Sequence, residues 1–213
     1  MNAEPITAGS VRTGKAAGDV PPVHPLWLRL THWLNALAVV LMVMSGWRIY
    51  NASPLFDFRF PDEITLGGWL ASAILWHFAA MWLLVVNGLI YLSINTASGR
   101  LWHRFFPLSP RGFVADLKAA FHGRLSHADP RRYNTVQRAA YLLVILDLVL
   151  LVLSGLVLWK SVQFPLLREL MGGYEAARYV HFVTMAALVG FVVIHVAMAL
   201  LVPRSLLHMI RGR

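Results

Sequence analysis

Four apolar stretches, each long enough to cross a lipid bilayer, constrain the fold of this chain more than any other feature. They cover residues 26–50, 66–94, 138–159 and 177–202 of a 213-residue sequence. About 20 apolar residues in a helix span the hydrocarbon core, and a helix satisfies its own backbone hydrogen bonds there. The composition, 58% hydrophobic and 14% charged, is that of a membrane protein. We therefore predict an all-α, integral membrane four-helix bundle that occupies residues 23–213.

The distribution of basic residues predicts the orientation of the bundle. Fourteen of the 19 Lys and Arg residues lie before or at the start of the first stretch, between the second and third or at the start of the third, or after the fourth. By the positive-inside rule, both termini and the long middle loop lie in the cytoplasm, as expected for a multi-pass protein of the bacterial inner membrane. The net charge of +9 thus reflects topology and contact with lipid headgroups, and we predict membrane lipid rather than nucleic acid as a partner.

Three segments outside the spans carry recognisable signals. Residues 1–22 lack apolar periodicity and are expected to form a disordered cytoplasmic tail. In the middle loop, Ser109 and Pro110 form a helix-start signal, which predicts a short amphipathic helix on the inner membrane face. Pro203 should end the fourth helix, and residues 205–210 are expected to form a short interfacial turn.

Candidate metal ligands are restricted by the absence of cysteine, which excludes disulfides, iron–sulfur clusters and covalent haem attachment. Five of the nine histidines lie in polar or interfacial stretches, and we interpret them as surface residues. The other four lie inside the spans or at their edges. They are His32, His77, His181 and His195. Ionisable side chains in a membrane are costly and are therefore candidates for function.

The four intramembrane histidines sort into two layers. His181 and His195 are 14 residues apart in the last stretch, so they share one helix face about 21 Å apart along the axis. Counting from the inner boundary places His32 beside His195 in the inner half and His77 beside His181 in the outer half. Each pair suits bis-histidine haem iron between two helices, whereas a zinc site would gather three or four ligands together. The alternative is that these histidines are hydrogen-bonded core residues.

A weak internal repeat accompanies the histidines. Residues 43–46 read Val-Met-Ser-Gly in the first stretch, and residues 152–155 read Val-Leu-Ser-Gly in the third. Small residues at these positions would let helices, or a flat macrocycle, approach closely.

The chain resembles the four-helix di-haem cytochrome b subunits of membrane-bound formate dehydrogenases and nickel–iron hydrogenases. These subunits are grouped with the bacterial cytochrome b561 proteins. The resemblance covers roughly residues 24–212. It rests on the Arg29-x-x-His32-Trp33 element, His77, residues 133–138 and the His181/His195 pair. It implies two haem b groups, with His32–His195 as the ligands of the inner haem and His77–His181 as those of the outer one.

The resemblance also implies a quinone site near the inner haem. The family uses an Asn and a Gln at the start of the third helix, and Asn134 and Gln137 are the matching positions. Amide side chains one turn apart can hydrogen-bond quinone carbonyls. The alternative role for both residues is capping the start of the helix.

Two further charged residues are candidates for a role beside the haems. Arg48, at the outer end of the first span, could meet a haem propionate or could be an ordinary interfacial arginine. Asp147 lies near mid-membrane and could relay protons towards the quinone, or could be a structural residue hydrogen-bonded to a group such as Asn87.

The function predicted from these residues is electron transfer through two stacked b-type haems, between a quinone pool and a periplasmic redox enzyme or cytochrome. One alternative is a self-sufficient quinone oxidoreductase that uses a small donor such as superoxide. A second alternative is a haem-free small transporter or assembly factor. The sequence does not specify whether the chain has catalytic activity of its own.

Overall fold

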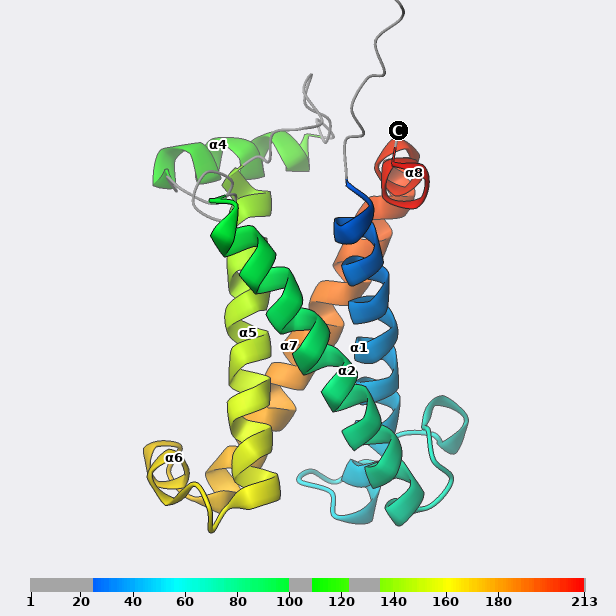
Figure 1. Ribbon diagram of the computed structural model, residues 1–213, viewed down its shortest axis with the longest axis vertical. Coiled ribbons are helices and arrows are strands. Elements are labelled where there is room, and N and C mark those ends of the chain that lie inside the picture. The colour runs from blue at the N-terminus through cyan, green and yellow to red at the C-terminus, as the bar shows by residue number, and fades with distance from the viewer. Residues whose placement is uncertain (1–24, 100–108, 123–134, 213) are drawn as a thin grey trace, which may run out of the picture.

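The computed structural model describes residues 25–99, 109–122 and 135–212, and it is all-helical over these residues. Four long helices form the bundle: α1 (Leu26–Ala52), α2 (Leu70–Ala97), α5 (Thr135–Lys160) and α7 (Tyr174–Leu201) (Figure 1). Each is apolar and, at about 40 Å, long enough to cross a bilayer. The predicted four-helix membrane bundle is confirmed, while the predicted tail at 1–22 lies outside the described residues.

The start of α2 differs from the apolar stretch that predicted it. The helix begins at Leu70 rather than at residue 66. Gly67 and Gly68 have φ values of 112° and 68°, which a right-handed helix cannot contain. Leu66 instead donates its backbone N–H to the carbonyl of Met44, 3.0 Å away, so this segment folds back onto α1.

Helix pairs α1–α2 and α5–α7 are the main packing units of the bundle. In Figure 1, α2 and α7 cross in the middle, between α5 on one side and α1 on the other. Small or short side chains recur every seven residues along the α1–α2 seam, which lets the two backbones approach as in other membrane helix pairs. These buried residues are Thr31, Ala38 and Ser45 on α1 and Ala73, Ala80 and Asn87 on α2.

A buried amide links α1 and α2 in the half of the bundle nearer α8. This half is called inner, and the opposite half outer, after the orientation predicted from the sequence. Asn87 Nδ2 donates hydrogen bonds to the carbonyl of Thr31 and to Asn35 Oδ1, both at 2.7 Å. Asn87, which the sequence suggested as one possible partner of Asp147, does not pair with it, because its amide faces α1 whereas Asp147 lies on α5. Asp147 Oδ2 is buried and has no hydrogen-bond partner among the residues that the structure describes.

Short helices cap both ends of the bundle. The predicted amphipathic helix is α4 (Pro110–Phe121), and its start is capped as expected, since Ser109 Oγ accepts the N–H of Gly112 at 3.2 Å. Where a turn was expected after Pro203, the chain forms α8 (Pro203–Arg211). Figure 1 shows α4 and α8 at one end of the bundle and α6 (Pro165–Leu170) at the other.

The C-terminal end of α8 is held by the first turns of α1. Arg29 Nε and Trp33 Nε1 both donate to the carbonyl of Met209, at 3.3 and 3.4 Å, and Arg29 also bonds the carbonyl of Ile210. The last carbonyls of a helix lack partners within it and carry the negative end of its dipole, so a cation there is stabilising. Arg29 and Trp33 of the Arg29-x-x-His32-Trp33 element thus bind the end of α8 to α1.

Arg29→Ala is expected to loosen α8 without unfolding the bundle. The loss is about 1 kcal/mol for each hydrogen bond removed, because the freed carbonyls regain water only partly. Hydrogen exchange measured along the chain should accelerate in the α8 amides and stay unchanged in α7. Arg29→Lys, which keeps the charge and one donor, should have a smaller effect; equal exchange in all three proteins would contradict this role.

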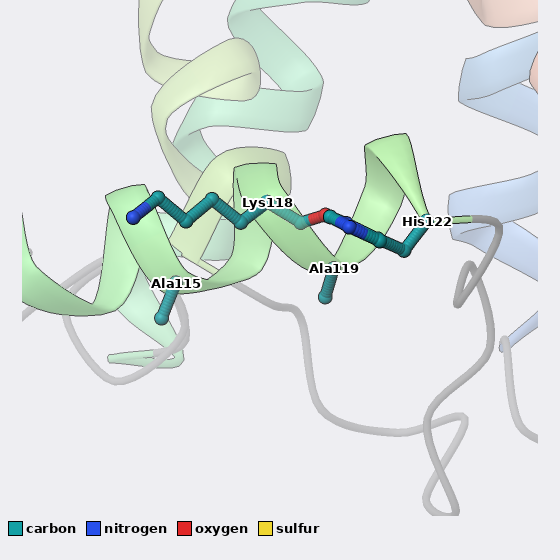
Figure 2. Close-up of a pocket in the computed structure, with 4 residues that line it drawn as sticks. All are labelled: Ala115, Lys118, Ala119 and His122. Atoms are coloured by element: carbon teal, nitrogen blue, oxygen red, sulfur yellow. The ribbon is translucent and has the colours of Figure 1, made fainter.

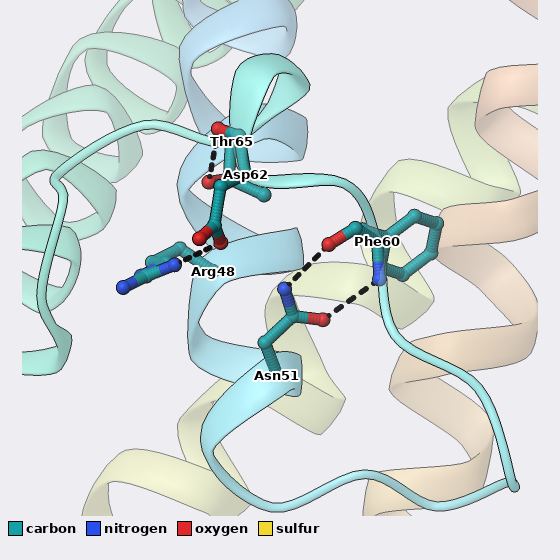
Figure 3. A network of polar contacts seen from close by, with 5 residues as sticks. All are labelled: Arg48, Asn51, Phe60, Asp62 and Thr65. Atoms are coloured by element: carbon teal, nitrogen blue, oxygen red, sulfur yellow. Dashed lines mark hydrogen bonds and ion pairs between the residues drawn. The ribbon is translucent and has the colours of Figure 1, made fainter.

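The loop between α1 and α2 is folded onto the outer end of α1 (Figure 3). Asn51 makes two hydrogen bonds to the backbone of Phe60, at 2.8 and 2.9 Å, and Arg48 pairs with Asp62 of the short 3₁₀ helix η1 (Asp62–Ile64). Thr65 Oγ1 donates to the carbonyl of Asp62 at 2.9 Å. These contacts fix the loop without any long-range pairing between strands.

Candidate functional site

Two histidine pairs lie between the helices, one above the other along α7. The imidazole centroids of His77 (α2) and His181 (α7) are 6.4 Å apart, and those of His32 (α1) and His195 (α7) are 6.0 Å apart. The structure therefore brings together the same two pairs that helix depth indicated. Within the described residues there is no cluster of three or more His, Asp or Glu side chains that could hold a metal ion, so a zinc-type site is not formed there.

The ring separations fit one metal ion between each pair. A metal–imidazole bond is about 2.0 Å, and the ring centre lies about 1.1 Å beyond the nitrogen, so two imidazoles on opposite sides of a metal have centroids about 6 Å apart. Both observed distances match this value. Two nitrogen ligands on opposite sides leave the equatorial positions to the four nitrogens of a porphyrin. The residues present thus fit bis-histidine haem.

Two glycines leave room beside the outer pair. A Cβ atom built on Gly46 would lie 3.4 Å from His77 Cε1, and one built on Gly155 would lie 3.4 Å from His181 Cε1. A larger side chain at either glycine would meet the ring itself. The adjacent serines, Ser45 and Ser154, are fully buried and contact the Nδ1 atoms of the same two rings.

The outer pair lies on an internal two-fold repeat of the bundle. Ser45-Gly46 of α1 contacts His77 of α2, and Ser154-Gly155 of α5 contacts His181 of α7 with matching distances. Each histidine is the eighth residue of its helix, after a segment that contains two glycines with positive φ. The Val-x-Ser-Gly repeat in the sequence indicated that α1 and α5 are related. A second repeat, His-Phe-x-x-Met at 77–81 and 181–185, relates α2 to α7 and was missed in the sequence.

The inner pair has aromatic rather than serine neighbours. Trp33 meets His32 edge to face, with ring centroids 5.5 Å apart. Phe191, one turn before His195 on α7, stacks on that ring at 5.7 Å and an interplanar angle of 13°. Such apolar surroundings suit a porphyrin and keep water from the metal.

The roles predicted for Arg48, Asn134, Gln137 and Asp147 stay predictions. Arg48 is paired with Asp62 at the outer end of α1, so a contact with a propionate stays a prediction. Gln137 lies exposed in the first turn of α5, and Asn134 lies outside the described residues. The quinone role of both residues therefore also stays a prediction. One carboxyl oxygen of Asp147 is buried, and its role as a proton relay stays a prediction.

A shallow hollow on α4 does not belong to this site. It is lined by Ala115, Lys118 and Ala119 of α4 and by His122 in the turn after this helix (Figure 2). His122 donates through Nδ1 to the carbonyl of Lys118 at 2.7 Å and is exposed, which agrees with its interpretation as a surface residue.

A multi-pass membrane bundle with paired histidines between its helices defines a class, the membrane-bound b-type cytochromes. Residues 23–212 match the family model of prokaryotic cytochrome b561, and the chain belongs to that family. It is therefore a membrane electron-transfer protein that binds b-type haem. The alternative of a haem-free transporter or assembly factor is wrong.

Two curated relatives are similar over most of their length. One is a putative protein-methionine-sulfoxide reductase subunit, YedZ1, of Azospira oryzae, which is 68% identical over 194 residues, 91% of this chain and 98% of that protein. The other is a probable Ni/Fe-hydrogenase B-type cytochrome subunit of Cupriavidus necator, 26% identical over 212 residues, 90% of this chain and 83% of that protein. No solved structure matches the chain significantly.

Proposed function

We propose that this chain carries electrons from a quinol in the bilayer to a protein-methionine-sulfoxide reductase at the outer membrane face. The observation that carries the proposal is that α7 presents His181 and His195 on one face, each opposite an imidazole of another helix. His32 and His195 would hold the inner of two b-type haems, and His77 and His181 the outer one. The name of the Azospira oryzae relative supports the choice of partner.

The electron balance of this proposal is complete. Oxidation of a quinol to a quinone releases two electrons and two protons. Reduction of a methionine sulfoxide to methionine consumes two electrons and two protons and releases one water molecule. When bound, b-type haem supplies a one-electron carrier. The chain itself holds the carriers at two depths and surrounds them with apolar helices that exclude water.

The orientation of the bundle belongs to the same proposal. The end that carries α4 and α8 is taken as cytoplasmic, because most Lys and Arg residues precede α1, lie between α2 and α5, or follow α7 in the sequence. The quinol would then bind near the inner haem, where Asn134 and Gln137 would donate hydrogen bonds to its oxygens. The loop at 53–69 and α6 would face the periplasmic partner.

Electron delivery is tested in vesicles that contain this chain, a menaquinol or ubiquinol, and the co-expressed reductase. Addition of a protein with oxidised methionines should start quinol oxidation, and omission of either the chain or the reductase should abolish it. No sulfoxide-dependent oxidation with the complete system would contradict the proposal. Rapid quinone reduction by superoxide with the isolated chain would instead favour a self-sufficient quinone oxidoreductase.

Gln137→Leu is expected to weaken quinol binding while leaving the haems in place. Loss of a hydrogen bond to a quinol oxygen should raise the KM for quinol roughly 5- to 30-fold, which corresponds to about 1–2 kcal/mol. Steady-state quinol oxidation at several quinol concentrations gives the KM, and an absorption spectrum gives the haem content. Gln163→Leu, the same change in an exposed turn after α5, is the control. An unchanged KM for Gln137→Leu would remove this residue from the site.

A further inference from the structure

Two buried serine hydroxyls lie against the outer histidine pair. Ser45 Oγ is 3.0 Å from His77 Nδ1, and Ser154 Oγ is 2.9 Å from His181 Nδ1. Both serines are completely buried in helix seams, and each also lies close to a backbone carbonyl of its own helix. Ser45 Oγ is 2.6 Å from the carbonyl of Leu41, and Ser154 Oγ is 2.7 Å from that of Leu150.

The direction of these hydrogen bonds follows from counting protons. A serine hydroxyl has one hydrogen to donate, and a carbonyl oxygen can only accept. The hydrogen is therefore used on the carbonyl four residues earlier, which is the shortest contact of each hydroxyl. The hydroxyl oxygen must then accept from Nδ1–H of the imidazole. This protonation leaves the lone pair of the neutral ring on Nε2, where a metal ion can bind it.

We propose that Ser45 and Ser154 are positioning residues for the outer haem, which fix His77 and His181 in the Nδ1–H tautomer and aim both Nε2 atoms at the iron. This inference rests on the proposed assignment of these two histidines as haem ligands. Partners of this kind orient a ligating imidazole and raise its basicity. Because a more basic ligand favours the oxidised metal, the serines lower the reduction potential of the outer haem.

The serine contacts belong to the outer layer of the bundle. Both ligands of the outer pair have a serine partner, related by the two-fold repeat. In the described part of the chain, His195 of the inner pair has no side-chain hydrogen bond and is instead stacked on Phe191. The outer pair therefore has a serine hydroxyl on both ligands, whereas His195 of the inner pair has none among the described residues.

The test compares Ser45→Ala, Ser154→Ala and the double variant in the full-length protein. Each single change should shift the midpoint potential of the outer haem in the positive direction and by a similar amount, and the double change should shift it further. Retention of the outer haem should weaken about 10- to 100-fold. A redox titration followed by optical and EPR spectra measures both haems separately, and the inner haem should not shift.

Two further variants separate the hydroxyl from the packing. Ser98→Ala is the control, because Ser98 Oγ also bonds the carbonyl four residues earlier, at 2.7 Å, and bonds no histidine among the residues that the structure describes. Ser45→Thr keeps the hydroxyl and should restore the wild-type potential, as Thr184 makes the same bond to its own helix.

Three results would overturn the proposal. They are an unchanged outer potential in both alanine variants, a shift confined to the inner haem, or a loss in Ser45→Thr equal to that in Ser45→Ala. A wild-type protein that binds no haem at the outer histidines would overturn the proposed function itself, and the spectrum of the unmodified protein distinguishes that case.

Discussion

Replacing His181 by alanine is expected to remove the outer haem and leave the inner one, so that the haem-to-protein ratio falls from about two to about one. His181 is one of two imidazoles 6.4 Å apart, and no other histidine among the described residues lies near enough in the outer layer to replace it. A reduced-minus-oxidised spectrum with a pyridine haem assay measures the ratio. His77→Ala should have the same effect, because it removes the opposite ligand.

The reciprocal changes remove the inner haem. His195→Ala and His32→Ala should each leave a single haem whose potential and EPR signal differ from those left by His181→Ala. The control is His122→Ala, since His122 is exposed in the turn after α4 and its ring bonds the carbonyl of Lys118. Loss of both haems from every single histidine variant would contradict two independent sites, and full haem content in His181→Ala would contradict the ligand assignment.

Gly155→Val is expected to displace His181 and so to abolish the outer haem, as completely as loss of the ligand. A Cβ at Gly155 already lies at van der Waals distance, 3.4 Å, from His181 Cε1, and the two methyl groups of valine extend beyond it. The buried seam between α5 and α7 leaves no direction in which the ring can move without strain. The haem-to-protein ratio should fall from about two to about one, and the remaining spectrum should be that of the inner haem.

Gly190→Val is the matched control for this change. Gly190 lies in the same helix as His181, and a Cβ there meets no atom within 4 Å. Both variants exchange a helical glycine for the same β-branched residue, so any general cost to the helix is shared. Equal haem contents in the two variants would contradict the role of Gly155 as the space beside the histidine.

The internal repeat explains why the two histidine pairs differ in their surroundings. His77 and His181 are equivalent positions of the two helix pairs and have matching contacts with Ser-Gly of the neighbouring helix. In the same alignment, the counterparts of His32 and His195 are Tyr141 and Tyr91. The inner pair therefore has histidine in one repeat position of each kind and tyrosine in the other.

The same alignment shows which residue of α1 corresponds to Asp147. Its counterpart in α1 is Ala38, which is completely buried against α2. Asp147 thus brings a carboxyl group to a seam position that the other half of the molecule fills with a methyl group. One of its oxygens is buried without a partner among the described residues, which is expensive in a membrane.

The sequence by itself determined the fold class, the four spans and the depth of each histidine. Apolar length, helical rise and the distribution of charges are local properties, and a membrane allows few alternatives to a helix. For this reason the helix bounds differ from the predicted spans by only a few residues, and the largest difference has a local cause in Gly67 and Gly68.

Only the tertiary structure decided which side chains meet across the helices. The partners of Asn87, the contact of Arg29 with the end of α8, and the serine beside each outer histidine all depend on how the helices rotate and cross. Rotation about a helix axis is set by packing against neighbours, and an apolar stretch without a strong polar face contains little information about it. The sequence placed the histidines in depth, and the packing of α1 on α2 and of α5 on α7 gave two of them their serine partners.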